Sequence, residues 1–176
     1  MPTIYTIGHS TRTSEELVAA LRSHGILTLV DIRAFPSSKR LPHFNRGVME
    51  GWLGEAGIDY RWKPEMGGRR GKPRADSPNT GLRNESFRAY GDHMLTEEFQ
   101  AAAAEVLRWA EEKPTAVMCA EKMWFQCHRM LVSDYYTTHG NEVLHIVDDR
   151  PAKPHTLTRE GHLVDGVLVY NAGQLF

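Results

Sequence analysis

The spacing of apolar residues along the chain alternates between two periods, and each period predicts one kind of element. Short runs rich in β-branched residues are typical of strands, and they occur at 4–7, 26–32, 58–62, 115–119 and 142–147. Between these runs, apolar residues recur every three or four positions, as in amphipathic helices, at 14–24, 46–56, 86–94, 97–112 and 127–139. Glu16 follows Thr13 at the spacing of a capping box, which supports a helix start at that point.

The order of these elements predicts the fold class. Strands and helices alternate, with two consecutive helices after the third strand. This pattern predicts a single α/β domain over 1–176, in which helices cover both faces of a largely parallel sheet of about five strands. Asp165 and Gly166 stand between two apolar runs near the C-terminus and predict an additional hairpin with a type I′ turn. Residues 67–84 show no periodicity, which indicates either a functional lid or disorder.

Composition narrows the class of protein. No apolar run approaches the ~20 residues of a membrane span, and no signal peptide is visible at the N-terminus. Two cysteines are too few for a disulfide framework. We therefore expect a cytoplasmic protein with no membrane partner and no cofactor.

The net charge of -1 conceals a basic segment. Residues 33–74 contain ten Lys or Arg and four Asp or Glu, so the rest of the chain is acidic. A local basic segment on an acidic body indicates an anionic ligand, and the alternative is an ordinary solvated surface.

Polar residues follow the predicted strands in a way that points to one site. The first four strands are followed by His9 and Ser10, by Asp31 and Arg33, by Gly68 and Arg69, and by Cys119 and Glu121. The carboxyl ends of parallel strands share one edge of a sheet, where ligands of α/β proteins bind. An Asp and an Arg near a strand end also form structural ion pairs, so Asp31 and Arg33 have that alternative. We favour the hypothesis that Arg33 faces an open anion pocket.

The two thiols lie on either side of a seven-residue connection. Cys127 and His128 begin a predicted helix, where free N–H groups favour an anion and lower the pKa of a thiol. Cys127 is therefore the first candidate nucleophile, and Cys119 is the second, although its place at the end of an apolar strand predicts a buried and inert thiol. Glu121 and His9 are candidate general acid/base groups.

Candidate ligand-binding residues surround these thiols. We expect an anion to be held by Ser10, Asp31, Arg33, Gly68, Arg69, His128 and Arg129. Two cysteines with His128 and His9 are also possible zinc ligands. However, seven residues separate the two cysteines, and this spacing is wider than the tight spacing typical of zinc sites. We therefore expect no metal.

An ordered set of motifs resembles one family. The motifs are Thr6-Ile7-Gly8-His9-Ser10, Leu29-Val30-Asp31-Ile32-Arg33, Pro36-Ser37 before Phe44-Asn45, Ala56-Gly57-Ile58, Met66-Gly67-Gly68-Arg69-Arg70, Phe87 with Tyr90, Met118-Cys119-Ala120-Glu121 and Cys127-His128-Arg129. On these residues the chain is similar to the domain of unknown function 488 family of bacteria and archaea. The resemblance implies a single α/β domain with a core at 3–147, and leaves 148–176 as a C-terminal extension. It implies no established activity.

Three functional hypotheses follow. The first is a small enzyme that acts on an anionic, phosphorylated or nucleotide-like small molecule, with Cys127 or Cys119 as nucleophile. The second is a nucleic-acid-binding module that uses the basic segment 33–74, with Trp62 and Phe44 as stacking residues. The third is a structural or partner-binding domain. The sequence does not indicate an oligomeric state.

Overall fold

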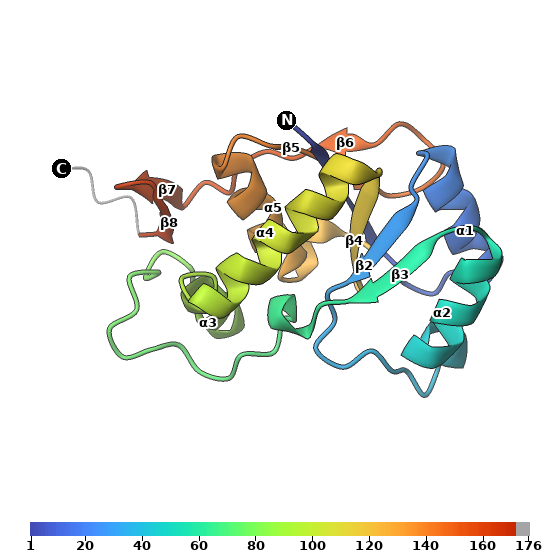
Figure 1. The fold of residues 1–176 in the computed structure, drawn as a ribbon. Helices are drawn as coiled ribbons and strands as arrows, with labels where there is room; N and C mark the ends of the chain where they lie inside the picture. Colours follow the sequence, from blue (N-terminus) through green and yellow to red (C-terminus); the bar gives the residue numbers. More distant parts are fainter. Residues whose placement is uncertain (172–176) are drawn as a thin grey trace.

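A computed structural model, which describes residues 1–171, shows an α/β sandwich with a small C-terminal hairpin (Figure 1). The elements in chain order are β1 (Thr3–Gly8), α1 (Ser14–Ser23), β2 (Thr28–Asp31), α2 (Arg46–Glu55), β3 (Asp59–Trp62), α3 (Glu85–His93), α4 (Glu97–Glu112), β4 (Thr115–Cys119), α5 (Arg129–Thr138), β5 (Glu142–Ile146), β6 (Lys153–Pro154), β7 (Gly161–Val164) and β8 (Val167–Tyr170). The predicted fold class is confirmed.

The main sheet has the strand order β3-β2-β4-β1-β5-β6. The first five strands of this order are parallel, and only the two-residue β6 pairs antiparallel, with β5. The sequence predicted about five strands, and β6 is the addition. A strand of two residues is too short to produce a hydrophobic period, so the pattern contained no signal for it.

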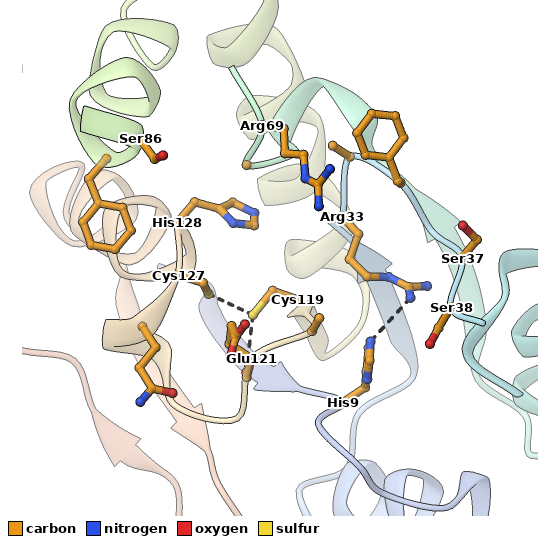
Figure 2. A pocket seen from close by; sticks show the side chains of 16 residues that line it. His9, Arg33, Ser37, Ser38, Arg69, Ser86, Cys119, Glu121, Cys127 and His128 are labelled. Carbon is orange, nitrogen blue, oxygen red and sulfur yellow. Dashed lines mark hydrogen bonds between the residues drawn. The ribbon is translucent and has the colours of Figure 1, made fainter. Parts of the chain in front are cut away.

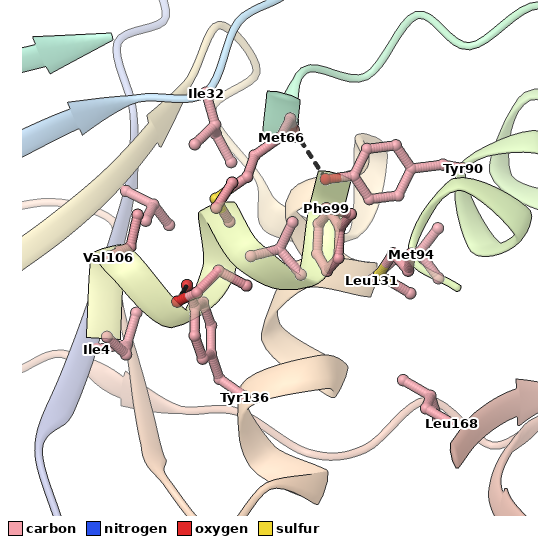
Figure 3. Close-up of a cluster of buried hydrophobic side chains, with 14 of the residues drawn as sticks. Ile4, Ile32, Met66, Tyr90, Met94, Phe99, Val106, Leu131, Tyr136 and Leu168 are labelled. Atoms are coloured by element: carbon pink, nitrogen blue, oxygen red, sulfur yellow. Dashed lines mark hydrogen bonds between the residues drawn. The ribbon is translucent and has the colours of Figure 1, made fainter. Parts of the chain in front are cut away.

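Two hydrophobic cores lie on opposite faces of this sheet, because successive side chains of a strand point to opposite faces. On β2, Leu29 packs into the core under α1 and α2, whereas Val30 packs into the core under α3, α4 and α5. Figure 3 shows the second core, in which Phe99 lies beside Tyr90 and Tyr136 lies near Ile4 of the sheet. Both faces are therefore covered, as the apolar strands predicted.

Helix starts agree with the capping signals. Thr13 and Glu16 form both hydrogen bonds of a capping box at α1. Thr96 accepts a hydrogen bond from the backbone N–H of Phe99 at the start of α4. The last helix differs slightly from its prediction, because α5 begins at Arg129 and Cys127 is still extended.

The remaining segments are irregular but anchored. Within 67–84, the side chain of Asp92 in α3 accepts hydrogen bonds from the backbone of Arg74 and from the side chains of Ser77 and Asn79. The β7–β8 hairpin turns at Asp165 and Gly166, both with positive φ, so the predicted type I′ turn is confirmed. Over residues 1–171, none of the helices has the length and apolar character needed to cross a membrane.

Candidate active site

A cleft of about 590 Å³ opens at the carboxyl ends of β1, β2 and β4 (Figure 2). The crossover from β1 runs through α1 toward β2, and the crossover from β4 runs through α5 toward β5 in the opposite direction. Open α/β sheets bind ligands where connections diverge in this way. The cleft is lined by His9, Arg33, Ala34, Phe35, Ser37, Ser38, Gly68, Arg69, Ser86, Phe87, Cys119, Ala120, Glu121, Gln126, Cys127 and His128.

The structure thus brings eight of the eleven predicted site residues to one cleft. These eight are His9, Arg33, Gly68, Arg69, Cys119, Glu121, Cys127 and His128. Ser10, Asp31 and Arg129 do not line it. Asp31 and Arg129 are fully buried and act on the cleft through neighbouring residues.

The two thiols are in direct contact. The Sγ atoms of Cys119 and Cys127 are 2.9 Å apart, and both cysteines are free. Cys119 was predicted to be buried, which is confirmed by its 2% exposure, whereas Cys127 is half-buried at the cleft wall. The backbone N–H of Arg129 also donates to Cys127 Sγ at 3.4 Å.

This contact makes the two thiols unequal. A hydrogen bond from the Cys119 thiol, together with His128 and the positive charge of Arg129, lowers the pKa of Cys127 despite its burial. Burial raises the pKa of Cys119 well above its usual range. Both shifts favour a Cys127 thiolate at neutral pH that accepts a hydrogen bond from the Cys119 thiol.

Arg129 supplies the charge behind this thiolate. Its guanidinium donates to the backbone oxygens of Glu121 and Lys122 at 2.9 and 3.0 Å. It forms no ion pair with a carboxylate among residues 1–171. The buried positive charge is therefore available to stabilise a neighbouring anion, and Cys127 is a group whose pKa it lowers.

Arg33 has a different environment. Its guanidinium forms a bidentate ion pair with Asp31 at 2.7 and 2.9 Å, and also donates to the backbone oxygen of Phe44. Its exposure is only 6%, and Tyr60 donates a further hydrogen bond to Asp31. The structural alternative for Asp31 and Arg33, an ion pair, is thus present in the fold. Binding of an external anion by Arg33 stays a prediction.

His9 lies between this ion pair and the cleft. Its Nδ1 contacts the backbone oxygen of Ser10, which can only accept, so Nδ1 carries the proton and Nε2 faces Arg33 at 3.4 Å. The ring stacks on Phe44 with centroids 4.1 Å apart. Burial and the nearby Arg33 charge lower the pKa of His9 to about 4, so the ring is neutral at pH 7.

The opposite wall of the cleft offers a free cation. Arg69 is exposed, lies over the ring of Phe35 at 5.3 Å, and forms no ion pair within the described part of the chain. Ser86, in the first turn of α3, borders the same space. Helix N-termini favour anions, so this wall is suited to a negatively charged ligand.

Two glycines allow the walls to approach each other. A Cβ on Gly68 would lie 2.5 Å from Nδ1 of His128, and a Cβ on Gly8 would lie 1.6 Å from the backbone oxygen of Glu121. Gly8 therefore lets residues 120–122 cross the end of β1, where their carbonyl groups meet Arg129. Glu121 contributes this carbonyl, and its exposed side chain lines the cleft.

Sequence reasoning missed several lining residues. Phe35, Ser37 and Ser38 follow β2. Ser86 lies in the first turn of α3, and Gln126 precedes α5. Ser37 and Phe87 belong to the motifs that resemble the family, and this was the only sequence signal that could have marked them as site residues. The others lie in irregular segments, where polar residues are common and carry no distinctive spacing.

The basic segment is less available than its composition indicated. Arg46 stacks on Trp62, Arg61 and Lys63 lie over Trp109, and Lys63 pairs with Glu105. Phe44 is fully buried, so the prediction that Phe44 stacks on bases is wrong for this structure. The nucleic-acid hypothesis gains no support here and stays a prediction.

The side chains that could bind a metal do not form a metal site within residues 1–171. Residues 1–171 contain no cluster of three or more His, Cys, Asp or Glu side chains placed to hold a metal ion. His9 has its two ring nitrogens at Ser10 and Arg33, and His128 donates from Nε2 to the backbone oxygen of Ile32 at 3.0 Å.

Comparison with known families identifies the group of proteins. The sequence profile of the domain of unknown function DUF488 matches residues 13–136, which is more than half of the chain. The chain belongs to the DUF488 family. This confirms the resemblance found in the sequence, and the match covers α1 to most of α5, including both thiols. No curated protein and no solved structure gives a significant match to this DUF488 domain.

Proposed function

We propose that this DUF488 domain is a thiol enzyme that acts on an anionic, phosphorylated or nucleotide-like small molecule. The observation that carries the proposal is that Cys127, whose Sγ lies 2.9 Å from Cys119 Sγ and whose pKa is lowered, lines the same cleft as Arg69, which has no ion pair among residues 1–171. A thiolate is the reactive form of cysteine, and enzymes that use one place it in an electropositive and partly exposed environment.

The anion would bind between Arg69 and the first turn of α3. The Asn84 side chain caps α3 by accepting a hydrogen bond from the N–H of Phe87, and within residues 1–171 the other N–H groups of the first turn remain available. Ser86 adds a hydroxyl, and Phe35 and Phe87 supply apolar walls beside the charged group. A combination of apolar walls with a few convergent polar groups is typical of small-molecule sites.

The reaction divides into two steps. In the first, Cys127 Sγ forms a bond to the electrophilic atom of the bound anion, and the leaving group departs with the electrons of the broken bond. In the second, water attacks this atom, the S-to-substrate bond breaks, and the thiolate is restored. Glu121 lines the cleft with an exposed carboxylate and is the candidate base that accepts the proton from water. His9 is neutral, contacts the guanidinium of Arg33 through its Nε2, and lines the same cleft as Cys127 and Glu121.

One assay tests both anion binding and thiol reactivity: alkylation of Cys127 with and without phosphate. Millimolar inorganic phosphate should slow alkylation of Cys127 in the wild type by severalfold, because phosphate and reagent compete for one cleft. Arg69→Ala should abolish this protection, and Lys72→Ala should retain it, since exposed Lys72 lies nearby but does not line the cleft. A phosphate effect that is absent, or equal in all three proteins, would contradict the proposal.

Catalysis is measured separately with 4-nitrophenyl phosphate, an anionic substrate with a good leaving group. Wild-type turnover should be lost in Cys127→Ser, because a serine hydroxyl is not ionised at this position. Glu121→Gln should slow release of the covalent intermediate, which then accumulates and is detectable as a mass increase on Cys127. Turnover that survives Cys127→Ser would remove this residue from the mechanism.

A further inference from the structure

The thiol pair has a geometry that a single nucleophile does not require. Cys119 and Cys127 are the only two cysteines of the chain, and their sulfur atoms are 2.9 Å apart. A hydrogen-bond donor that lowers the pKa of a nucleophile need not be a sulfur, and Cys119 fills this role for Cys127 together with His128 and Arg129. A second sulfur in contact adds another capability, because two thiols at this distance can become one covalent link.

The distance to a covalent bond is short. A disulfide has its sulfurs ~2.05 Å apart, so the two atoms need to approach by about 0.9 Å. Cys119 is fixed at the end of β4, but Cys127 belongs to the connection before α5 and has extended backbone angles. A small shift of this connection therefore closes the gap without movement of the sheet. Figure 2 shows the two side chains pointing toward each other across the cleft floor.

The two thiols also differ in access. Cys127 lines the cleft and is half-buried, so a small molecule reaches its sulfur from solvent. Cys119 is 2% exposed and is covered by Cys127 and by the backbone oxygen of Glu121, 3.5 Å from its sulfur. An external reagent therefore meets Cys127 first, and Cys119 is placed to react only with Cys127.

We propose that Cys119 and Cys127 carry out reversible thiol–disulfide exchange with a small-molecule disulfide. This activity rests on Cys127 as the reactive thiol, as the proposed function does, but it does not require an anionic substrate. In its oxidised form the protein would lack a free nucleophile, so the same reaction would switch off thiol chemistry in the cleft.

The exchange balances in two steps. The Cys127 thiolate attacks one sulfur of the external disulfide, which breaks the S–S bond, forms a mixed disulfide and releases one thiolate. The Cys119 thiol then loses its proton and attacks the Cys127 sulfur, which forms the internal disulfide and releases the second thiolate. The protein loses two electrons and the Cys119 proton, and the external disulfide gains the two electrons as two thiolates, which take up protons from the Cys119 thiol and from solvent.

The surroundings of Cys127 influence the position of this equilibrium. The hydrogen bond from Cys119, His128 and the charge of Arg129 stabilise the reduced state through the Cys127 thiolate, and a stabilised reduced state makes a disulfide easier to reduce. Each unit by which the pKa of Cys127 is lowered favours reduction by up to about tenfold. The internal disulfide is therefore expected to be labile rather than structural.

The test uses oxidised and reduced glutathione with the full-length protein. After incubation with oxidised glutathione, the wild type should lose two hydrogen atoms in mass, and both thiols should resist alkylation until dithiothreitol is added. Cys119→Ser should stop at a stable glutathione adduct on Cys127, and Cys119→Ala should give the same result if serine perturbs folding. Cys127→Ser should acquire no adduct, because Cys119 is covered.

Two results would overturn the proposal. One is a wild-type protein that accumulates the glutathione adduct on Cys127 with no internal disulfide. The other is a wild type in which both thiols stay free under oxidising buffer. Neither result depends on phosphate binding or on turnover of 4-nitrophenyl phosphate, so failure of this proposal and failure of the proposed function are distinguishable.

Discussion

Arg33 and Arg129 are both almost fully buried near the carboxyl edge of the sheet, but their charges are balanced in different ways. Arg33 follows β2 and forms a bidentate ion pair with Asp31. Arg129 begins α5 and is held by the carbonyl groups of Glu121 and Lys122, with no carboxylate partner among residues 1–171. One charge is neutralised inside the fold, and the other remains to act on the thiols.

The difference explains why similar residues have different consequences. Carbonyl dipoles solvate a guanidinium but do not cancel its charge, so Arg129 raises the local positive potential around Cys127. The Asp31–Arg33 pair has no net charge, and it instead fixes the position of His9 and the segment after β2. We infer that Arg129 tunes the nucleophile and Arg33 shapes the cleft.

The largest expected effect follows from breaking the neutralised pair. Arg33→Ala leaves the Asp31 carboxylate buried without its cation, which costs ~3–5 kcal/mol of unfolding free energy. In a domain of this size the melting temperature should fall by roughly 6–20 °C. Thermal melts followed by circular dichroism measure this loss.

A matched double variant isolates the cause. Asp31→Leu together with Arg33→Met removes both charges and keeps apolar volume, so the protein should recover much of the lost stability. A single variant Arg33→Ala that melts like the wild type would show that this pair contributes no structural stability.

The next effect concerns Arg129, which should influence reactivity more than stability. Arg129→Met leaves the carbonyls of Glu121 and Lys122 without donors, at a cost of ~1–3 kcal/mol. The pKa of Cys127 should rise, and the midpoint of its alkylation rate against pH should move upward by the same amount. Arg83→Met, which changes an exposed arginine of the same chain, serves as control and should leave both quantities unchanged.

An intermediate effect concerns pH, through His9. Its pKa is lowered to about 4 in the folded protein, so between about pH 4 and 6.5 the unfolded state binds the additional proton. The contribution of His9 is therefore complete above pH 6.5 and is lost as pH falls, at about 1.4 kcal/mol per pH unit. His145 and His93 also have lowered pKa values because of burial, and they add to the wild-type slope.

Comparison of variants separates His9 from the other histidines. Urea unfolding of His9→Asn across this pH range should give a slope smaller by about one proton than that of the wild type. His162→Gln changes an exposed histidine and should keep the wild-type slope. An unchanged slope in His9→Asn would mean that His9 titrates alike in the folded and unfolded states.

The smallest effect is expected at Glu121. Arg129 contacts its backbone oxygen, and its side chain is exposed, so Glu121→Gln should alter unfolding free energy by less than about 0.5 kcal/mol. The pH dependence of Cys127 alkylation should also stay as in the wild type. A clear change in either would show that the carboxylate, and not only the carbonyl group, supports the thiolate.

The regular part of the fold could be read from the sequence because its signals are repeated along each element. The bounds of β4 were predicted at 115–119 and are found there, since Thr115 and the four apolar residues after it, between Pro114 and a polar loop, leave little freedom. Parallel strands then bring their ends to one edge whatever their order, so the gathering of these residues at one cleft could be predicted without knowledge of the strand order.

The sequence did not predict the direction in which each side chain at that edge points. Arg129 was expected to hold a ligand, but it turns inward to carbonyl groups of an irregular loop that has no sequence period. The contact between Cys119 and Cys127 depends on the same loop, whose path is set by Gly8 on another strand. The buried chain of hydrogen bonds from Asp134 of α5 through His155 to His145 of β5 was also missed, because His155 lies in the irregular segment after β6.

The central claim is that Cys127 is a thiolate at neutral pH, and its alkylation by iodoacetamide tests this most directly. Rates are followed for each cysteine by mass spectrometry of the native protein between pH 4 and 10. Cys127 should label with a midpoint well below pH 8.5 and much faster than Cys119. Equal and slow labelling of both cysteines, with midpoints at or above pH 8.5, would contradict the account.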